Sequence, residues 1–147
     1  MLVDPTVFEE VSLSDLARIR QYVEQSAIAI GGDPDAVGEL IVAMSEALAN
    51  IIKHGYQGYC CRIELALLRG GSDLLVRIWD NAPLFNPLSV PEPDTSLPLS
   101  QRPIGGMGVH LMRNFADEIS YRVTPEGKNE LTLCKKQALL NPQLGEN

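Results

Sequence analysis

Three polar side chains of different chemistry recur at four-residue intervals near the middle of the chain: Glu46, Asn50 and His54. Residues four apart in a helix lie one above the other on the same face, so the three would form one line. A carboxylate there could accept a proton, an amide oxygen could ligate Mg²⁺, and an imidazole could add a donor. Ala43 and Ala47 lie beside this line, where small side chains would let another group approach closely. The alternative is a solvated helix face without a site.

The helix that would carry this line is predicted to run from residue 34 to residue 54. Asp33 is a favoured N-cap, Pro34 suits the first helical position, and Gly55 ends the helix. Apolar residues at helical spacing define a stripe that must face a core: Val37, Leu40, Ile41, Met44, Leu48, Ile51 and Ile52.

Asp80 is a second candidate, because it ends the predicted strand LLVRIWD. A carboxylate only accepts hydrogen bonds, so at the end of a strand it suits recognition of an exocyclic amine. The alternative is ordinary turn chemistry, since Asp-Asn opens many loops.

A glycine turn precedes the predicted helix VHLMRNFAD and contains Gly105, Gly106 and Gly108. Such a turn allows backbone N–H groups and a helix N-terminus to meet phosphates. Arg102, just upstream, could pair with a phosphate or with a surface acid. The turn does not directly follow a strand, and no Gly-Lys-Ser/Thr follows it, so neither a dinucleotide fingerprint nor a P-loop is indicated. The alternative is a loop-to-helix turn that needs positive φ.

The remaining elements predict an α+β domain. Ser12 and Asp15 have the spacing of a capping box at the start of a first helix, which Gly31-Gly32 ends. Alternating runs around the turns RGGSD and TPEGK predict two antiparallel hairpins, and TVFEEV could add an edge strand. Helices and hairpins in this order indicate helices packed on one face of a sheet.

Two segments do not fit regular elements. Residues 82–104 hold six of the ten prolines, and a loop of this length is usually a functional lid or a disordered stretch. The tail 137–147 carries Pro142 and Gly145 and is expected to be frayed.

Composition narrows the classes of function. The chain has 147 residues, the size of one domain, and a net charge of −7, which argues against nucleic acid or an anionic membrane as the main partner. The three cysteines have no C-x-x-C spacing, so we expect no disulfide framework, no zinc site and a reduced, cytoplasmic location. We also expect no membrane helix and no secretory signal.

The order of these motifs resembles the GHKL (Bergerat-fold) ATPase superfamily, and within it the bacterial anti-sigma-factor serine-protein kinases. The resemblance covers about residues 14–136 and is carried by MSEALANIIKHGY, IWDNAPLFNP, GGMGVHLMRNFADEISY and NELTLCKK. It implies a single histidine-kinase-like ATPase domain over residues 1–147. The implied fold is a two-layer α/β sandwich with helices on one face of an antiparallel or mixed sheet, and residues 82–104 are the expected mobile ATP lid.

The resemblance also implies roles for individual residues. Glu46 should be the general base, and Asn50 should hold the Mg²⁺ that bridges the ATP phosphates. Asp80 should accept from the adenine amino group with support from Thr132. Phosphate contacts are expected from the glycine turn and, more weakly, from three basic side chains: Gly105, Gly106, Gly108, Lys53, His54 and Arg102.

Two positions depart from the family pattern, and at one of them Leu84 stands where many members have a second glycine. Ala82 replaces the glycine of the usual Asp-x-Gly, and its methyl group could crowd the base or restrict the turn. This departure motivates an alternative in which the chain is a non-catalytic, nucleotide-binding regulatory module.

The kinase interpretation implies ATP and Mg²⁺, a serine acceptor on a small antagonist protein, sequestration of a sigma factor, and a homodimer. It implies no direct contact with nucleic acid or membrane. A plain α+β interaction domain with coincidental motifs is the alternative outside the family.

Overall fold

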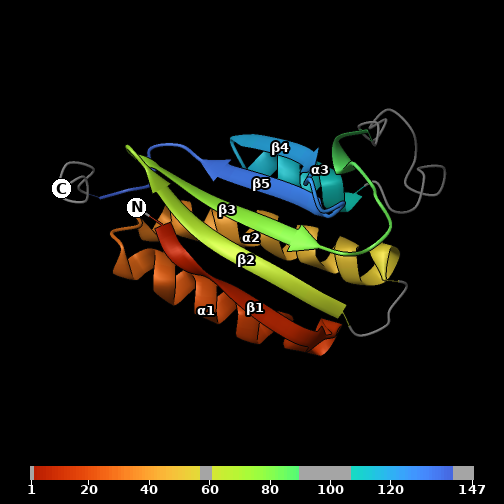
Figure 1. The fold of residues 1–147 in the computed structure, drawn as a ribbon. Helices are drawn as coiled ribbons and strands as arrows, with labels where there is room; N and C mark the ends of the chain where they lie inside the picture. The colour runs from red at the N-terminus through yellow and green to blue at the C-terminus, as the bar shows by residue number, and fades with distance from the viewer. Residues whose placement is uncertain (1, 57–60, 90–106, 141–147) are drawn as a thin grey trace.

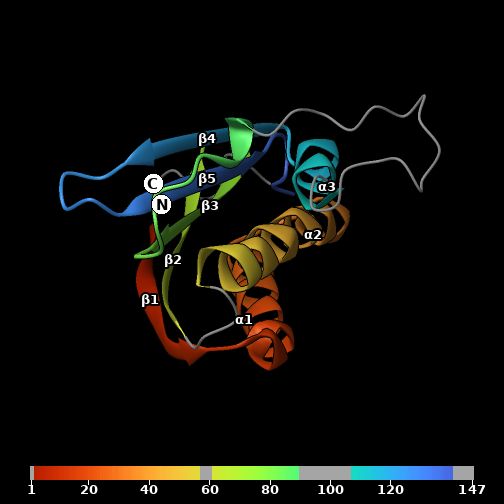
Figure 2. The same ribbon diagram turned by 90° about the vertical axis from the view of Figure 1, so that its right-hand side faces the viewer.

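The computed structural model describes the backbone of residues 2–56, 61–89 and 107–140. Its sheet is antiparallel, with five strands in the order β1-β2-β3-β5-β4, and α1, α2 and α3 cover one face (Figures 1 and 2). The predicted α+β sandwich is therefore confirmed, and the sheet is purely antiparallel. The strands are β1 Leu2–Val11, β2 Cys61–Gly70, β3 Asp73–Asp80, β4 Glu118–Val123 and β5 Asn129–Lys135. The helices are α1 Leu16–Ala29, α2 Pro34–Asn50 and α3 Met107–Phe115.

The helix boundaries follow the capping signals. The Ser12 backbone N–H donates to the Asp15 carboxylate at 2.9 Å, and this capping box opens a short 3₁₀ turn (Leu13–Asp15) before α1. Gly31 has φ +98°, the left-handed conformation that ends a helix readily only at glycine. The Asp33 carboxylate accepts from the Ala36 N–H at 3.0 Å and caps α2.

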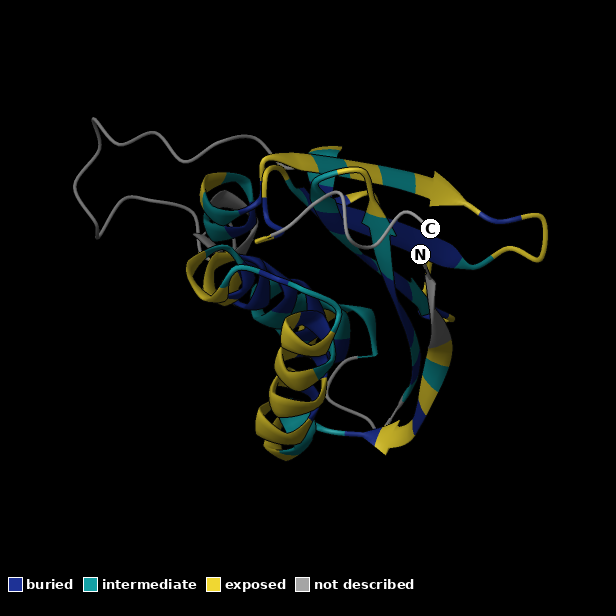
Figure 3. Ribbon diagram, turned by 90° about the vertical axis from the view of Figure 1, so that its left-hand side faces the viewer, coloured by how far each residue is buried: buried dark blue, intermediate teal, exposed yellow. Residues whose placement is uncertain are grey.

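The core lies between the sheet and the helices (Figure 3). The predicted apolar stripe of α2 is buried, except that Ile51 is half-buried. Ala43 and Ala47 are also buried, on the helix against which α3 packs. Among the described residues, no helix combines the length and apolar character needed to cross a membrane.

Both predicted hairpins are present, and β1 is the predicted edge strand, longer than TVFEEV. The expectation of a frayed tail is wrong for residues 137–140. Ala138 and Leu139 are buried, and Leu139 forms a β-bridge with Gly32. The rest of the tail, 141–147, lies outside the described residues, as do residues 90–104 of the predicted lid.

Candidate functional site

Asp80 is a buried carboxylate at the end of the core-facing side of β3. Alternate residues of the strand are buried, and Asp80 follows Val76 and Ile78 on the face that packs against the helices. Only 5% of Asp80 is exposed. A charged group in such a place needs hydrogen-bond partners.

The two oxygens of Asp80 differ in their partners. Oδ1 accepts from the Ala82 backbone N–H and from Asn129 Nδ2, both at 2.9 Å. Within the described part of the chain, nothing donates to Oδ2. Burial raises the pKa of Asp80, and the hydrogen bonds from Asn129 and Ala82 oppose that shift by stabilising the ionised form. One oxygen is therefore held by the protein, and the other can accept from a ligand.

Asn129 was not predicted, and it is the residue that supports Asp80. The two lie directly opposite each other on β5 and β3. Asn129 Nδ2 also donates to the Ala82 carbonyl at 3.1 Å, and Oδ1 accepts from the Phe85 N–H at 3.1 Å and from the Tyr121 hydroxyl. Asn129 could have been identified as the residue opposite Asp80 if the register between β3 and β5 had been known. That register depends on pairing between residues far apart in the sequence, which no local motif reveals.

The prediction that Thr132 supports Asp80 is wrong. Thr132 pairs with Arg77, and its hydroxyl accepts from Arg77 Nε at 3.0 Å. Residues three apart on a strand point to opposite faces of the sheet. Arg77 and Thr132 therefore lie on the face away from the helices, and Asp80 lies on the other.

Ala82 and Gly55 bring together two segments: the turn that begins at Asp80, called here the aspartate turn, and the residues that follow α2. A Cβ built on Gly55 would lie 2.9 Å from the Ala82 Cβ, closer than real Cβ atoms pack. The methyl group of Ala82 is buried against this glycine. Two motifs that are far apart in the sequence therefore meet here.

The end of α2 is extended by one π-helical turn, Ile51–Gly55. The Tyr56 N–H donates to the Ile51 carbonyl at 2.9 Å, which closes this wider turn. The Tyr56 hydroxyl accepts from the Asn81 N–H at 2.7 Å, next to Asp80. This hydrogen bond is a second link between the helix end and the aspartate turn.

Glu46 and Asn50 lie on one flank of α2. They share this flank with Glu39, given 3.6 residues per turn. The Glu39 carboxylate pairs with Lys135, whose Nζ also donates to the Phe115 carbonyl, at the end of α3, at 3.3 Å.

Both Glu46 and Asn50 are half-buried, and neither side chain hydrogen-bonds to a described residue. A carboxylate and an amide one helical turn apart are thus available to a ligand. An amide oxygen is a hard donor of the type that Mg²⁺ accepts beside phosphate oxygens, so this donor set fits that ion. Lys53 and His54 lie beyond α2, in the π-helical turn, and are exposed.

The other predicted phosphate contacts are not tested. Arg102, Gly105 and Gly106 lie outside the described residues, and Gly108 is in the first turn of α3. Their roles stay predictions.

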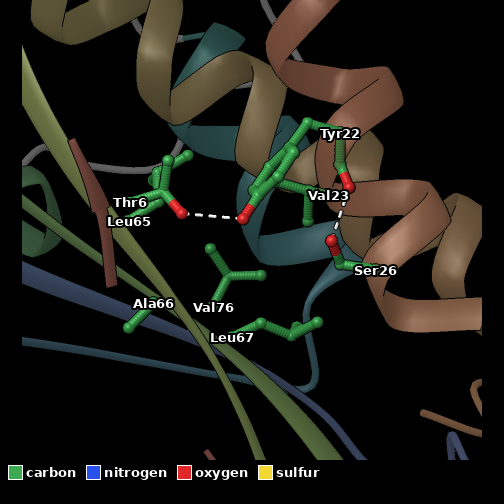
Figure 4. A pocket seen from close by; sticks show the side chains of 8 residues that line it. All are labelled: Thr6, Tyr22, Val23, Ser26, Leu65, Ala66, Leu67 and Val76. Carbon is green, nitrogen blue, oxygen red and sulfur yellow. Dashed lines mark hydrogen bonds between the residues drawn. The ribbon is translucent and has the colours of Figure 1, made fainter. Parts of the chain in front are cut away.

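A small cavity between α1 and the sheet is separate from these residues. It measures about 10 Å³, room for about one water, and lies near Thr6, Tyr22 and Leu65 (Figure 4). The Thr6 and Tyr22 hydroxyls are hydrogen-bonded at 2.7 Å across it. It is too small for a nucleotide.

Sequence comparisons relate most of the chain to known proteins. A family model described as a histidine kinase-like ATPase domain matches residues 10–135, which include Glu46, Asn50, Asp80 and Asn129. The serine/threonine-protein kinase BtrW of Bordetella bronchiseptica (strain ATCC BAA-588 / NCTC 13252 / RB50) is 32% identical over 100 residues, which cover 67% of this chain and 70% of that protein. The chain therefore belongs to the histidine kinase-like ATPase domain family.

Proposed function

We propose that the chain binds ATP with Mg²⁺ and transfers the γ-phosphoryl group to a serine hydroxyl of a small antagonist protein. The observation that carries this proposal is the asymmetry of Asp80. Its Oδ1 holds two hydrogen bonds from the protein, and its Oδ2 takes none from the described residues. Such a carboxylate suits a ligand that brings its own donor.

Adenine supplies that donor. Its exocyclic amine can donate to Asp80 Oδ2, whereas guanine would present a carbonyl oxygen to the same carboxylate. A buried acceptor left unpaired, or placed against another acceptor, is costly, so Asp80 should favour a 6-amino purine.

Glu46 and Asn50 support the transfer step. Glu46 is available to take the proton from the attacking serine hydroxyl, and Asn50 would hold the metal ion beside the phosphates. When bound, Mg²⁺ supplies neutralisation of the phosphate charge. Phosphoryl transfer depends mainly on positioning and charge, which a half-buried carboxylate and amide on one rigid helix can provide.

The acceptor and the regulatory partners rest on similarity. The similar Bordetella protein is named a serine/threonine-protein kinase, which supports a protein hydroxyl as acceptor. The motif order supports sequestration of a sigma factor and a homodimer as further parts of the same proposal.

The test is transfer of label from γ-labelled ATP to proteins that co-purify with the chain from its own cell extract. Glu46→Gln keeps the size of the side chain but removes the base. We expect it to lower transfer about 100-fold or more, with ATP affinity within about twofold of wild type. Glu24→Gln, on the exposed side of α1, is the matched control and should transfer as wild type.

The outcomes separate the two functions. ATP binding without transfer to any co-purified protein supports the non-catalytic module that Ala82 motivates. Undiminished transfer by Glu46→Gln removes Glu46 from the mechanism. No binding of ATP at millimolar concentration contradicts both functions.

A further inference from the structure

We propose that Asn129 is the positioning residue for nucleobase recognition: its side-chain amide fixes Asp80 so that Oδ2 alone faces the base. The inference rests on the proposed function and extends it to a residue outside the predicted site. Asn129 is 6% exposed and lies directly across from Asp80.

The orientation of the Asn129 amide is determined at both ends. Nδ2 donates to Asp80 Oδ1 and to the Ala82 carbonyl, two groups that can only accept. Oδ1 accepts from the Phe85 N–H and the Tyr121 hydroxyl. A flipped amide would place its oxygen against two acceptors and its NH₂ against a backbone donor. The amide is therefore always a donor toward Asp80.

This donor decides which oxygen of Asp80 is available. With Asn129 and Ala82 both bound to Oδ1, rotation of the carboxylate would break two hydrogen bonds in a buried site. The same amide holds the Ala82 carbonyl and the Phe85 N–H. The acceptor for the base and the start of the segment after β3 are thus fixed by one side chain.

The experiment measures preference for the 6-amino group. Binding of ATP is compared with binding of purine riboside triphosphate, which lacks that group, in wild type and in Asn129→Val. We expect Asn129→Val to weaken ATP binding about tenfold, since hydrogen bonds to charged groups have about this effect. Binding of the analogue should change by less than about twofold. A structural defect alone would weaken both nucleotides equally.

Matched variants isolate the contact with Asp80. Thr132→Val makes the same kind of replacement three residues along β5, on the other face of the sheet. Tyr121→Phe removes a donor to Asn129 Oδ1 and leaves the bond to Asp80. Both should keep the wild-type preference for ATP. In an Asp80→Asn background, Asn129→Val should not change the preference further.

Each result supports or overturns the role of Asn129 in nucleobase recognition. If wild type prefers ATP and Asn129→Val keeps that preference, or loses affinity for both nucleotides equally, the inference is overturned while the proposed function stands. If wild type binds ATP no better than the analogue, the proposed recognition by Asp80 fails as well. Thermal unfolding checks that Asn129→Val folds. Asn129→Ala, which removes the donor without placing a second carboxyl group beside Asp80, gives the same comparison if it does not.

Discussion

Gly55 and Ala82 fit together only because one of them has no side chain: a Cβ on Gly55 would lie 2.9 Å from the Ala82 Cβ. The contact joins the π-helical turn after α2 to the turn after Asp80. Ala82 stands where the family that this sequence resembles usually has glycine. In this chain the extra methyl group is accommodated by the missing side chain at position 55.

Gly55→Ala should therefore destabilise the protein. Overpacking of this kind lowers the free energy of unfolding by about 1–3 kcal/mol, even though alanine favours helix more than glycine does. Urea unfolding measures the effect. Ala82→Gly should restore most of the loss in the double variant, because it removes the opposing methyl group. A double variant that is no more stable than Gly55→Ala would contradict this interpretation.

Asp80→Asn should separate stability from binding. Burial raises the pKa of Asp80 in the folded protein, so the folded state binds this proton more readily than the unfolded state. Protonation of Asp80 therefore stabilises the folded state. This contribution is complete below the ordinary pKa near 3.8 and is lost as pH rises through the raised pKa. An asparagine oxygen can accept the same two hydrogen bonds without the charge.

At pH 7 the Asp80→Asn variant without nucleotide should be at least as stable as wild type, and its affinity for ATP should fall about 10- to 100-fold. Thermal unfolding at pH 4 and pH 7, together with calorimetry of ATP binding, measures both. A variant that is less stable at pH 7 would show that the ionised carboxylate stabilises the fold.

Glu130, on the other face of the sheet, should give stability the opposite pH dependence. The hydrogen bond from Arg122 lowers the pKa of Glu130, and Trp79 Nε1 donates to the same carboxylate at 2.8 Å. The stability from this ionised group is present above its ordinary pKa near 4.5 and is lost as pH falls through the lowered pKa.

Glu130→Gln keeps an acceptor for Trp79 and removes the charge. Its free energy of unfolding should therefore fall less than that of wild type between pH 7 and pH 3. Glu24→Gln, on the exposed side of α1, should follow wild type. Parallel pH curves for wild type and Glu130→Gln would remove Glu130 as a source of acid sensitivity.

Local signals were enough to predict most of the fold. The capping pair Ser12–Asp15, the N-cap Asp33 and the alternation around two turns depend on neighbours in the sequence, and all of them are present in the structure. Asp80 was found as a candidate because it ends a strand.

Pairing between distant residues could not be predicted in the same way. The partner of Asp80 depends on register across 49 residues, and three positions along β5 separate Asn129 from the residue chosen by resemblance, Thr132. That odd offset reverses the face of the sheet. The π-helical turn after α2 likewise leaves no local pattern that distinguishes it from a continued α-helix.

The segment after β5 is the other long-range feature, and it predicts a stabilising role for Leu139. The Asp33 N–H donates to the Ala138 carbonyl at 2.6 Å, and the Leu140 N–H donates to the Gly31 carbonyl at 2.9 Å. These two hydrogen bonds join the connection between α1 and α2 to residues 138–140, which follow β5. Leu139 is 7% exposed and belongs to the core, whereas its neighbour Leu140 is 60% exposed.

Leu139→Ala should lower the free energy of unfolding by about 2–3 kcal/mol, because it removes buried methyl groups and leaves a cavity. Leu140→Ala makes the same chemical change one residue away on an exposed side chain and should stay within about 0.5 kcal/mol of wild type. Urea unfolding of the two variants measures the difference between them. Equal stability of the two would mean that this segment does not hold the α1–α2 connection in solution, and that the hydrogen bonds to Gly31 and Asp33 contribute little to the fold.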